Sequence, residues 1–252
     1  MASEEEDSDL PEEYNMDHKR RGLALIFNQE NFSEHAPRRG TDQDKEALTK
    51  RFEELGFEVN VYNDEKRKDI LDRAKKVAEE DHTDADCFVC VVLSHGDEGN
   101  KIFATDEEVN IKEITHLFKE DKCKSLAGKP KIFIFQACRG KHFENAVTPM
   151  AGGDEEVEEQ AVVCTLPAGE DFLMCYSVSE GFYSFRDSNY GGFYIQDLCK
   201  TLQTQGSTLE FTELLTLVNL KVSRCDIGVR KWKQMPCFTS MLTKKLYFRP
   251  KP

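Results

Sequence analysis

The sequence lacks the features that would assign it to a membrane, to the secretory pathway or to nucleic acid. No apolar run among its 252 residues approaches the roughly 20 residues that a membrane-spanning helix needs. The N-terminus "MASEEEDSDLPEEYNMD" has no basic segment followed by an apolar one, so it is not a signal peptide. Positive charge is scarce, because 34 Lys and Arg against 47 Asp and Glu leave a net charge of −13. This charge disfavours nucleic acid and anionic membranes as partners.

The sequence has many cysteines but no pattern that would hold a metal. Nine cysteines without a secretory signal predict reduced thiols in the cytosol. Cys87 and Cys90 have the C-x-x-C spacing of redox and zinc sites, but they belong to the apolar run "CFVCVVLS". Positions three apart on a strand face opposite sides of a sheet, so their sulfurs should diverge. No second C-x-x-C or histidine pair completes a zinc site. We therefore expect no metal and no cofactor, and we disfavour a C-x-x-C oxidoreductase.

Two acidic segments lack the patterning of folded elements. Residues 1–13 hold seven acids and few apolar groups, and residues 141–163 contain "TPMAGGDEEVEEQ". We interpret the second segment as a linker between two well-patterned halves. The predicted division is an acidic tail (1–21), a larger half (22–140), the linker (141–163) and a smaller half (164–252).

Strand-like apolar runs alternate with amphipathic helical patterns along both halves. Strands are predicted at 22–28, 57–63, 87–94, 131–137, 172–179 and 237–248, and helices at 66–80, 111–119, 192–205 and 209–222. A further helix should begin at Thr41, which with Asp44 has the spacing of a capping box, and end at Gly56. This alternation predicts an α/β fold with a mainly parallel sheet that is flanked by helices on both faces.

Chemically active residues directly follow two of the predicted strands. In such sheets, ligands bind beyond the carboxyl ends of the strands. "KIFIFQACRG" places Cys138 after one strand, and "SHGDEGN" places His95 after another. If the two strands are neighbours, the thiol and the imidazole form a nucleophile–base pair. Gly96 and Gly140 would allow the close backbone approach that an oxyanion hole requires.

These motifs resemble those of the caspase family. "QACRG" is the local signature of caspases, and "SHG", "QACRG", "YSFR" and "SMLTKKLYF" fall in caspase order and spacing from about Gly22 to Phe248. The short tail is similar to that of executioner caspases. The resemblance implies a caspase-like three-layer sandwich whose sheet continues across a dimer. It also implies an aspartate-specific cysteine endopeptidase, made as a zymogen and acting in apoptosis, with His95, Gly96 and Cys138 in its catalytic centre.

The resemblance further implies a pocket that binds the substrate aspartate. A buried carboxylate needs charge-assisted donors, and the planar guanidinium of arginine supplies two at once. Arg38 in "APRRGTD" and Arg186 in "YSFRD" match the family's two specificity arginines, and we prefer Arg38 to Arg39. Gln136, on the same strand face as Cys138, is expected to add an amide donor.

Other expected substrate contacts cluster around the second arginine and comprise Tyr183, Ser184, Phe185, Asp187 and Phe193. Asp187 replaces the asparagine of several relatives, so we expect it to disfavour an acidic residue four positions before the cut. The stretch 222–236 is shorter than the matching loop of executioner caspases, and Trp232 is expected to fill part of the gap.

Processing sites and partners also follow from the resemblance. Asp154 is the only aspartate between Cys138 and Asp171, so we expect self-cleavage there and trimming after Asp9 in the tail. The expected partners are proteins with aspartate at the cut position, a second copy that forms a dimer of large and small subunit pairs, initiator caspases and caspase inhibitors. The expected location is the cytoplasm, with the nucleus as a further compartment.

Two other functions remain as alternatives. A non-enzymatic caspase-like scaffold would bind partners, but it would be free to lose His95, Cys138 or the arginines, all of which are present. Cleavage after Arg or Lys, as in metacaspases, would need an acidic pocket instead of two arginines.

Overall fold

The computed structural model describes residues 12–140, 142–143 and 169–251. The predicted processing residues Asp9 and Asp154, and most of the predicted linker, lie outside the described residues.

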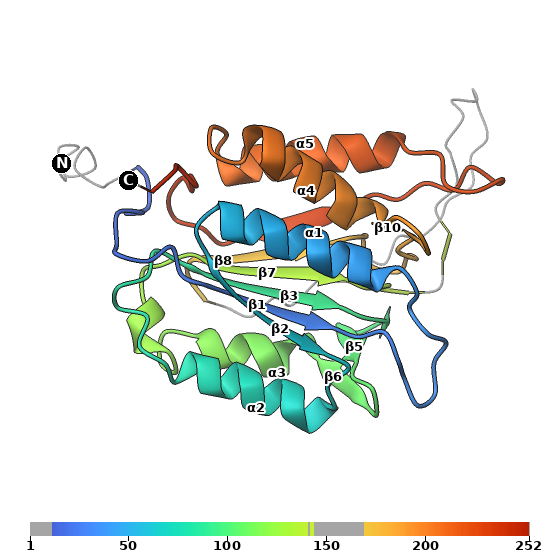
Figure 1. Ribbon diagram of the computed structural model, residues 1–252, viewed down its shortest axis with the longest axis horizontal. Coiled ribbons are helices and arrows are strands. Elements are labelled where there is room, and N and C mark those ends of the chain that lie inside the picture. The colour runs from blue at the N-terminus through green and yellow to red at the C-terminus, as the bar shows by residue number, and fades with distance from the viewer. Residues whose placement is uncertain (1–11, 141, 144–168, 252) are drawn as a thin grey trace, which may run out of the picture.

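A six-stranded sheet forms the centre of the described chain (Figure 1), with the strand order β11–β8–β7–β3–β1–β2. The strands are β1 (Leu23–Asn28), β2 (Glu58–Asn63), β3 (Phe88–Leu93), β7 (Lys131–Gln136), β8 (Phe172–Tyr176) and β11 (Cys237–Ser240). The first five pair in parallel, and β11 pairs antiparallel to β8 at one edge. The mainly parallel sheet predicted from the sequence is confirmed.

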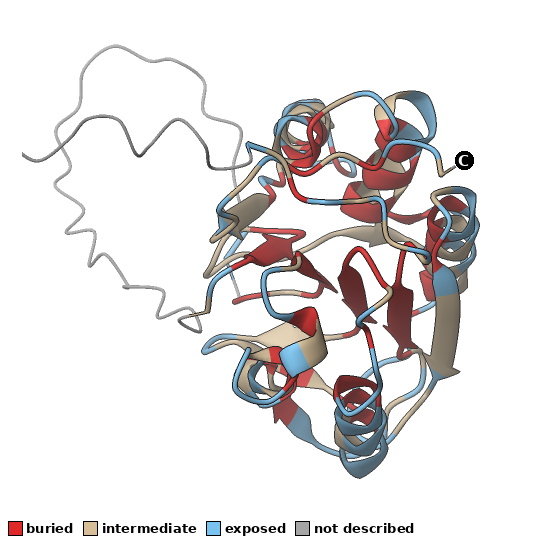
Figure 2. Cartoon of the chain, turned by 90° about the vertical axis from the view of Figure 1, so that its left-hand side faces the viewer, coloured by how far each residue is buried: buried red, intermediate tan, exposed pale blue. Residues whose placement is uncertain are grey.

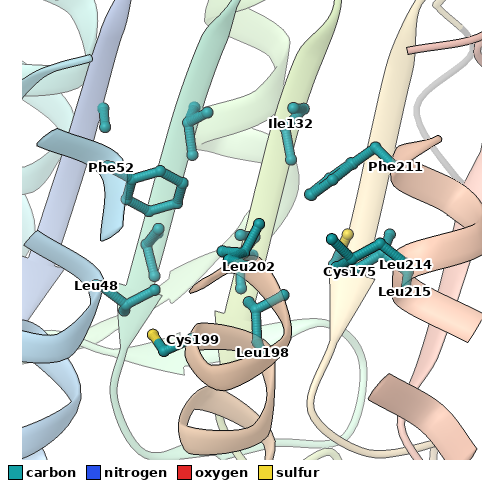
Figure 3. Packing of buried hydrophobic residues seen from close by; sticks show 14 of the residues in the cluster. Leu48, Phe52, Ile132, Cys175, Leu198, Cys199, Leu202, Phe211, Leu214 and Leu215 are labelled. Atoms are coloured by element: carbon teal, nitrogen blue, oxygen red, sulfur yellow. The ribbon is translucent and has the colours of Figure 1, made fainter. Parts of the chain in front are cut away.

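Helices cover both faces of this sheet (Figure 1). One face carries α1 (Thr41–Glu54), α4 (Phe193–Gln205) and α5 (Phe211–Arg224), and the other carries α2 (Arg67–Ala78), α3 (Ile111–Thr115) and the 3₁₀ helices η1 (His116–Phe118) and η2 (Lys124–Leu126). In Figure 3, leucines of α1, α4 and α5 converge on the strands, as amphipathic stripes do when they bury apolar surface. None of the helices in the described ranges is both long and apolar enough to cross a membrane.

The central strands are buried on both faces (Figure 2), which explains their continuous apolar runs. Alternate residues of each strand enter the two separate cores. Cys87 belongs to the core under α1, α4 and α5, and Cys90 belongs to the core under α2 and α3. The two sulfurs therefore lie on opposite faces of the sheet, as the spacing predicted.

Helix α1 begins at Thr41, but the predicted capping box is wrong. Gly40 precedes the helix in a left-handed conformation, and no side chain caps the first turn. Thr41 and Asp44 are instead buried, because Thr41 Oγ1 donates to Asn28 Oδ1 at 2.7 Å and Asp44 Oδ1 accepts from Gly192 N at 2.9 Å. Gly56, with a φ of 87°, follows the helix as the sequence predicted.

The predicted strand at 237–248 is too long, since β11 ends at Ser240. Two of the apolar residues beyond it, Leu246 and Phe248, are nevertheless buried, and Phe248 packs edge-to-face against Phe57 and Phe211. Lys245 forms an isolated parallel bridge with Glu13 instead of continuing the ladder with β8. Burial alone therefore explains the apolar pattern.

The tail predicted for residues 1–21 is partly packed into the fold. The buried Tyr14 hydroxyl donates to Asp171 Oδ1 at 2.5 Å. Glu13 accepts from both Nη atoms of Arg249 at 2.6 and 3.1 Å. The folded unit therefore begins upstream of the predicted boundary, and this segment holds the two halves of the chain together.

Two small sheets, not predicted from the sequence, lie beyond the carboxyl ends of the central strands (Figure 1). One consists of β4 (Gly96–Asp97), β5 (Lys101–Phe103) and β6 (Glu108–Asn110), and the other is the hairpin of β9 (Arg186–Asp187) and β10 (Gly191–Gly192). Strands of two or three residues are too short to show an alternating pattern. They place several of the candidate residues around one rim.

Candidate active site

The two chemically active residues meet because their strands are neighbours. β3 and β7 pair in parallel with Leu93 opposite Gln136, and Ser94 N donates to Gln136 O at 3.1 Å. His95 and Cys138 therefore follow the strands at equivalent positions. Both line one cleft of about 440 Å³, together with Arg38, Ser94, Gln136, Ala137, Phe143, Tyr183, Ser184, Phe185 and Arg186.

The His95 ring is oriented by a backbone carbonyl. Its Nε2 lies 2.8 Å from the carbonyl oxygen of Ala36, in the loop between β1 and α1. An acceptor at this distance requires the proton on Nε2, which leaves Nδ1 able to accept one. Phe32 and His35 pack beside the ring, at 4.8 and 5.6 Å between centroids. Burial lowers the pKa of His95, so the imidazole is neutral at pH 7 and can act as a base.

The Cys138 thiol is half-buried and in its protonated form. Its Sγ donates to the Ser184 carbonyl at 3.7 Å. Burial raises the pKa of Cys138, although Arg38 and Arg186 act in the opposite direction. A protonated thiol needs a base to become a nucleophile, and the neutral His95 in the same cleft is suited to that role.

Glycines allow the backbone to pack closely around this thiol. A Cβ atom on Gly96 would lie 2.3 Å from the Cys138 carbonyl oxygen, and one on Gly140 would lie 2.3 Å from Gly181. Any larger residue would force these segments apart. Backbone bonds of 2.9 to 3.0 Å between residues 139–142 and 181–182 connect the thiol's segment to the C-terminal half.

The arginine of the "QACRG" motif packs against β8 and a neighbouring loop. Arg139 is buried, with its guanidinium 4.0 Å from the centre of the Tyr176 ring, and its Nη2 donates to Asn100 Oδ1 at 3.2 Å. Cation–π and hydrogen-bond contacts of this kind anchor the loop to β8. This arginine therefore has a structural place beside the site.

The two candidate specificity arginines face each other across the cleft. Arg38 is 1% exposed, and its Nη1 donates to Gln29 O at 3.0 Å and to Thr41 Oγ1 at 2.8 Å. Burial and the charge of Arg186 lower the pKa of Arg38 to about 9. Arg186 is half-buried, and its Nε donates to the carbonyl of the exposed Arg39 at 2.8 Å. Two like charges held this close form a receptor for an anion.

Donors and acceptors remain unused inside this receptor. Arg38 Nε and Gln136 Oε1 are buried and have no hydrogen-bond partner among the described residues. Gln136 Nε2 donates to Ser184 Oγ at 2.8 Å. A buried polar atom without a partner is costly, so a ligand that satisfied these atoms would recover that cost.

An aromatic cluster borders the other end of the cleft. Phe143 stacks on Tyr183 and Trp232, with centroids 4.5 and 4.7 Å apart, and lies 6.1 Å from Phe185. The prediction that Trp232 fills part of the space left by the 222–236 stretch stays a prediction, and the structure places its ring against Phe143. Sequence reasoning missed Phe143, which is 46% exposed and follows the thiol by five positions.

Two expected contact residues do not line this cleft. Asp187 accepts from the backbone N–H groups of Asn189 and Tyr190 at 2.8 and 3.1 Å, which closes the β9–β10 turn. Phe193 is the first residue of α4. Within the described residues no cluster of three or more His, Cys, Asp or Glu is placed to hold a metal ion.

Comparison with known proteins places this arrangement in context. Residues 21–247 match the family model described as "Caspase domain". The chain is 53% identical to Caspase-6 of Mus musculus, covering 97% of this chain and 94% of the relative, and 42% identical to Caspase-7 of Gallus gallus, covering 94% and 80%. The crystal structure of Caspase-1 from Spodoptera frugiperda superposes with a TM-score of 0.86 at 35% identity, covering 96% of this chain and 94% of that one.

Proposed function

The chain belongs to the caspase family and is an aspartate-specific cysteine endopeptidase, and we propose that Cys138 is its nucleophile and His95 its general base. The observation that carries these assignments is the convergence in one cleft of a protonated thiol, a neutral imidazole and two arginines, of which Arg38 has a buried Nε without a partner among the described residues. Its substrates are proteins that are cut after aspartate.

The proposed reaction proceeds through a thioester. His95 Nδ1 takes the thiol proton as Sγ attacks the scissile carbonyl, and the backbone N–H groups of Gly96 and Cys138 receive the developing oxyanion. The tetrahedral intermediate collapses when His95 returns the proton to the leaving amine. A water molecule, deprotonated by His95, then attacks the thioester, and the released thiolate regains the proton.

The aspartate pocket is assigned to Arg38, Arg186 and Gln136. The unused Nε of Arg38 can donate to a substrate carboxylate, and Arg186 faces it from the small half. The Gln136 amide can rotate so that its NH₂ group faces the carboxylate while the Ser184 hydroxyl donates to Oε1. Gln136 ends β7, Arg186 begins β9, and the Arg38 side chain is held by the Gln29 carbonyl and Thr41 Oγ1, which favours a preorganised site.

The aromatic cluster of Phe143, Tyr183, Phe185 and Trp232 is assigned to an upstream substrate residue. Stacked rings offer a large apolar surface that an apolar side chain can cover. We therefore expect peptides with an aromatic or branched aliphatic residue before the aspartate to be preferred over peptides with a second acid there.

Assembly and processing complete the proposal. The cleft takes Cys138 and His95 from the larger half (22–140) and Arg186 from the smaller half (164–252), so both pieces must remain associated after a cut at Asp154. β11 is an edge strand, and we assign it to pairing with a second copy across a two-fold axis. Initiator caspases, caspase inhibitors and a cytoplasmic and nuclear location belong to the same proposal.

A peptide series tests the assignment. Purified protein is incubated with peptides that differ only in Asp, Glu, Arg or Lys at the cut position, beside the Cys138→Ala variant. We expect cleavage of the Asp peptide alone, and no cleavage by the variant. No hydrolysis by the wild type would favour the scaffold alternative, and equal hydrolysis by Cys138→Ala would exclude this nucleophile.

A further inference from the structure

A buried carboxylate lies directly behind the aspartate pocket. Asp44 on α1 has no exposed surface, and both of its oxygens accept from Gly192 N at 2.9 Å. Its Oδ1 also accepts from Gln196 Nε2 at 2.8 Å. In all of these bonds the partner donates, an arrangement suited to an ionised carboxylate.

This carboxylate connects the two halves of the chain at the pocket. Gly192 is the residue of β10 that pairs with Arg186 of β9. A Cβ atom on Gly191 would lie 2.1 Å from Asp44 Oδ1, and one on Gly192 would lie 2.9 Å from the Gln136 side chain. Asp44, the β9–β10 hairpin and Gln136 are therefore packed with no intervening space, and a shift of one displaces the others.

The charges around Asp44 match this arrangement. Arg38 faces it from the preceding loop, Arg186 from β9 and the Cys199 thiol from α4, and its negative charge favours the charged forms of both arginines. Burial raises the pKa of Asp44 to about 6, against the opposing effect of its hydrogen bonds and of the arginines. Asp44 is therefore ionised at pH 7, because its hydrogen bonds and the two arginines offset part of the effect of burial.

We propose that Asp44 is a positioning residue whose ionised carboxylate holds the β9–β10 hairpin so that Arg186 and Gln136 meet the substrate carboxylate. This inference rests on the proposed function of the cleft. When Asp44 is protonated, one of its oxygens no longer accepts and the remaining bonds from Gly192 N and Gln196 Nε2 lose their charge assistance, so the pocket loosens. Affinity for aspartate should therefore fall as the pH decreases through the range in which Asp44 titrates.

Kinetics of Asp44→Asn test the proposal. The loss of charge-assisted bonds should raise KM for the Asp peptide about 10- to 100-fold, with kcat within about 3-fold of wild type. The matched control is Asp69→Asn, which removes the same charge from the first turn of α2 on the opposite face of the sheet and should leave both constants unchanged. An unchanged KM in Asp44→Asn would overturn the proposal.

The pH dependence of substrate binding is measured with a variant that binds the peptide but cannot cut it. In a Cys138→Ala background, the Kd of an uncut Asp peptide is measured by fluorescence anisotropy between pH 5 and 8. We expect binding to weaken below pH 6, and not to weaken there when Asp44→Asn is added. Protonation of His95 in the same cleft adds a positive charge in both proteins and acts in the opposite direction. Since the Asp side chain of the peptide titrates near 3.9, about two pH units lower, it does not cause this change. Identical profiles with and without Asp44→Asn would also overturn the proposal.

Gln196→Met provides a test if Asp44→Asn does not fold. This change removes a donor to the ionised carboxylate, which raises the pKa of Asp44, so the weakening of binding should begin at a higher pH. A role in packing alone would not move this transition, and an unmoved transition contradicts the inference. If the wild type binds and cleaves no Asp peptide, the proposed function itself fails, which is a separate outcome.

Discussion

Replacing Arg38 by methionine should make the free protein more stable and nearly inactive. The side chain is buried, and within the described residues its Nη1 is bound only by two neutral oxygens, of Gln29 and Thr41. Methionine has no charge and extends as far as the position of Arg38 Nε, so it keeps the apolar part of the side chain. The substitution therefore separates two effects of the buried cation: its effect on the free energy of unfolding of the free protein, and its effect on the binding of a substrate carboxylate.

The effect on stability is estimated from the pKa of Arg38. Burial and the neighbouring Arg186 lower it from 12.5 to about 9, and at 1.36 kcal/mol per pKa unit this cost is about 5 kcal/mol. The cost applies in full at pH 7, because the guanidinium is charged there in both the folded and the unfolded chain. Against this gain, the Gln29 carbonyl loses its donor, at a cost of about 1–3 kcal/mol, and Thr41 Oγ1 loses one bond but still donates to Asn28, at a cost of about 0.5–1 kcal/mol. We expect the free energy of unfolding to rise by about 1–3 kcal/mol.

The effect on catalysis has the opposite sign. A substrate carboxylate that enters the pocket loses one of its two cations, at a cost of about 3–5 kcal/mol. This corresponds to a fall in kcat/KM for the Asp peptide of about 10²- to 10⁴-fold. The same residue thus destabilises the free enzyme and stabilises the complex.

Thermal unfolding at pH 7.5 and peptide hydrolysis measure the two effects on the same samples. A gain of 1 kcal/mol should raise Tm by about 2–4 °C for a chain of this size. Arg51→Met is the matched control, because Arg51 is a buried arginine of α1 that is paired with Glu54. It should lose stability and keep its kinetics. A less stable Arg38→Met protein with normal kinetics would refute the reasoning.

Further predictions concern the catalytic pair, the N-terminal contact and processing. His95→Ala should lower kcat by several orders of magnitude. In the wild type, burial lowers the pKa of His95, so kcat/KM should fall on the acid side only below pH 6.5. A fall that begins above pH 6.5 would contradict a neutral base. Tyr14→Phe removes the buried hydrogen bond to Asp171 and should lower the free energy of unfolding, measured in urea, by about 1–3 kcal/mol. Unchanged stability would contradict this prediction. Mass spectrometry should find wild-type protein cut after Asp154 but both Asp154→Ala and Cys138→Ala intact, and a cut in Cys138→Ala would point to another protease.

Much of the fold could be predicted because it depends on short-range patterns. Runs such as "CFVCVVL" are apolar at every position, since β3 is covered on both faces, and the faces of Cys87 and Cys90 follow from strand geometry alone. The strand-end rule also placed His95 and Cys138 on one rim, since parallel strands have their carboxyl ends at the same edge. These inferences need only the local alternation of side chains and the direction of the strands.

Other parts of the site depend on which distant segments meet. The contact that orients His95 comes from the backbone carbonyl of Ala36, and the identity of a side chain does not predict a backbone contact. Phe143 becomes part of the aromatic cluster only because Trp232, distant in sequence, lies against it. Asp44 resembles a helix cap in sequence, yet its partners are 148 and 152 positions away. A capping pattern considers only the N–H groups at the start of the same helix. In the folded chain, Asp44 instead accepts from Gly192 N of the β9–β10 hairpin.

The sequence by itself thus determined the layers of the fold, the strand ends that carry the chemistry and, through its motifs, the family. Tertiary structure alone decided how far β11 pairs, which residues close the pocket around Arg38 and Arg186, and that Asp44 lies behind them. The physical reason is that secondary-structure periodicity is encoded in neighbouring residues. Contacts between Asp44 and Gly192, or between Phe143 and Trp232, depend instead on sheet order, register and close packing, which no local pattern records.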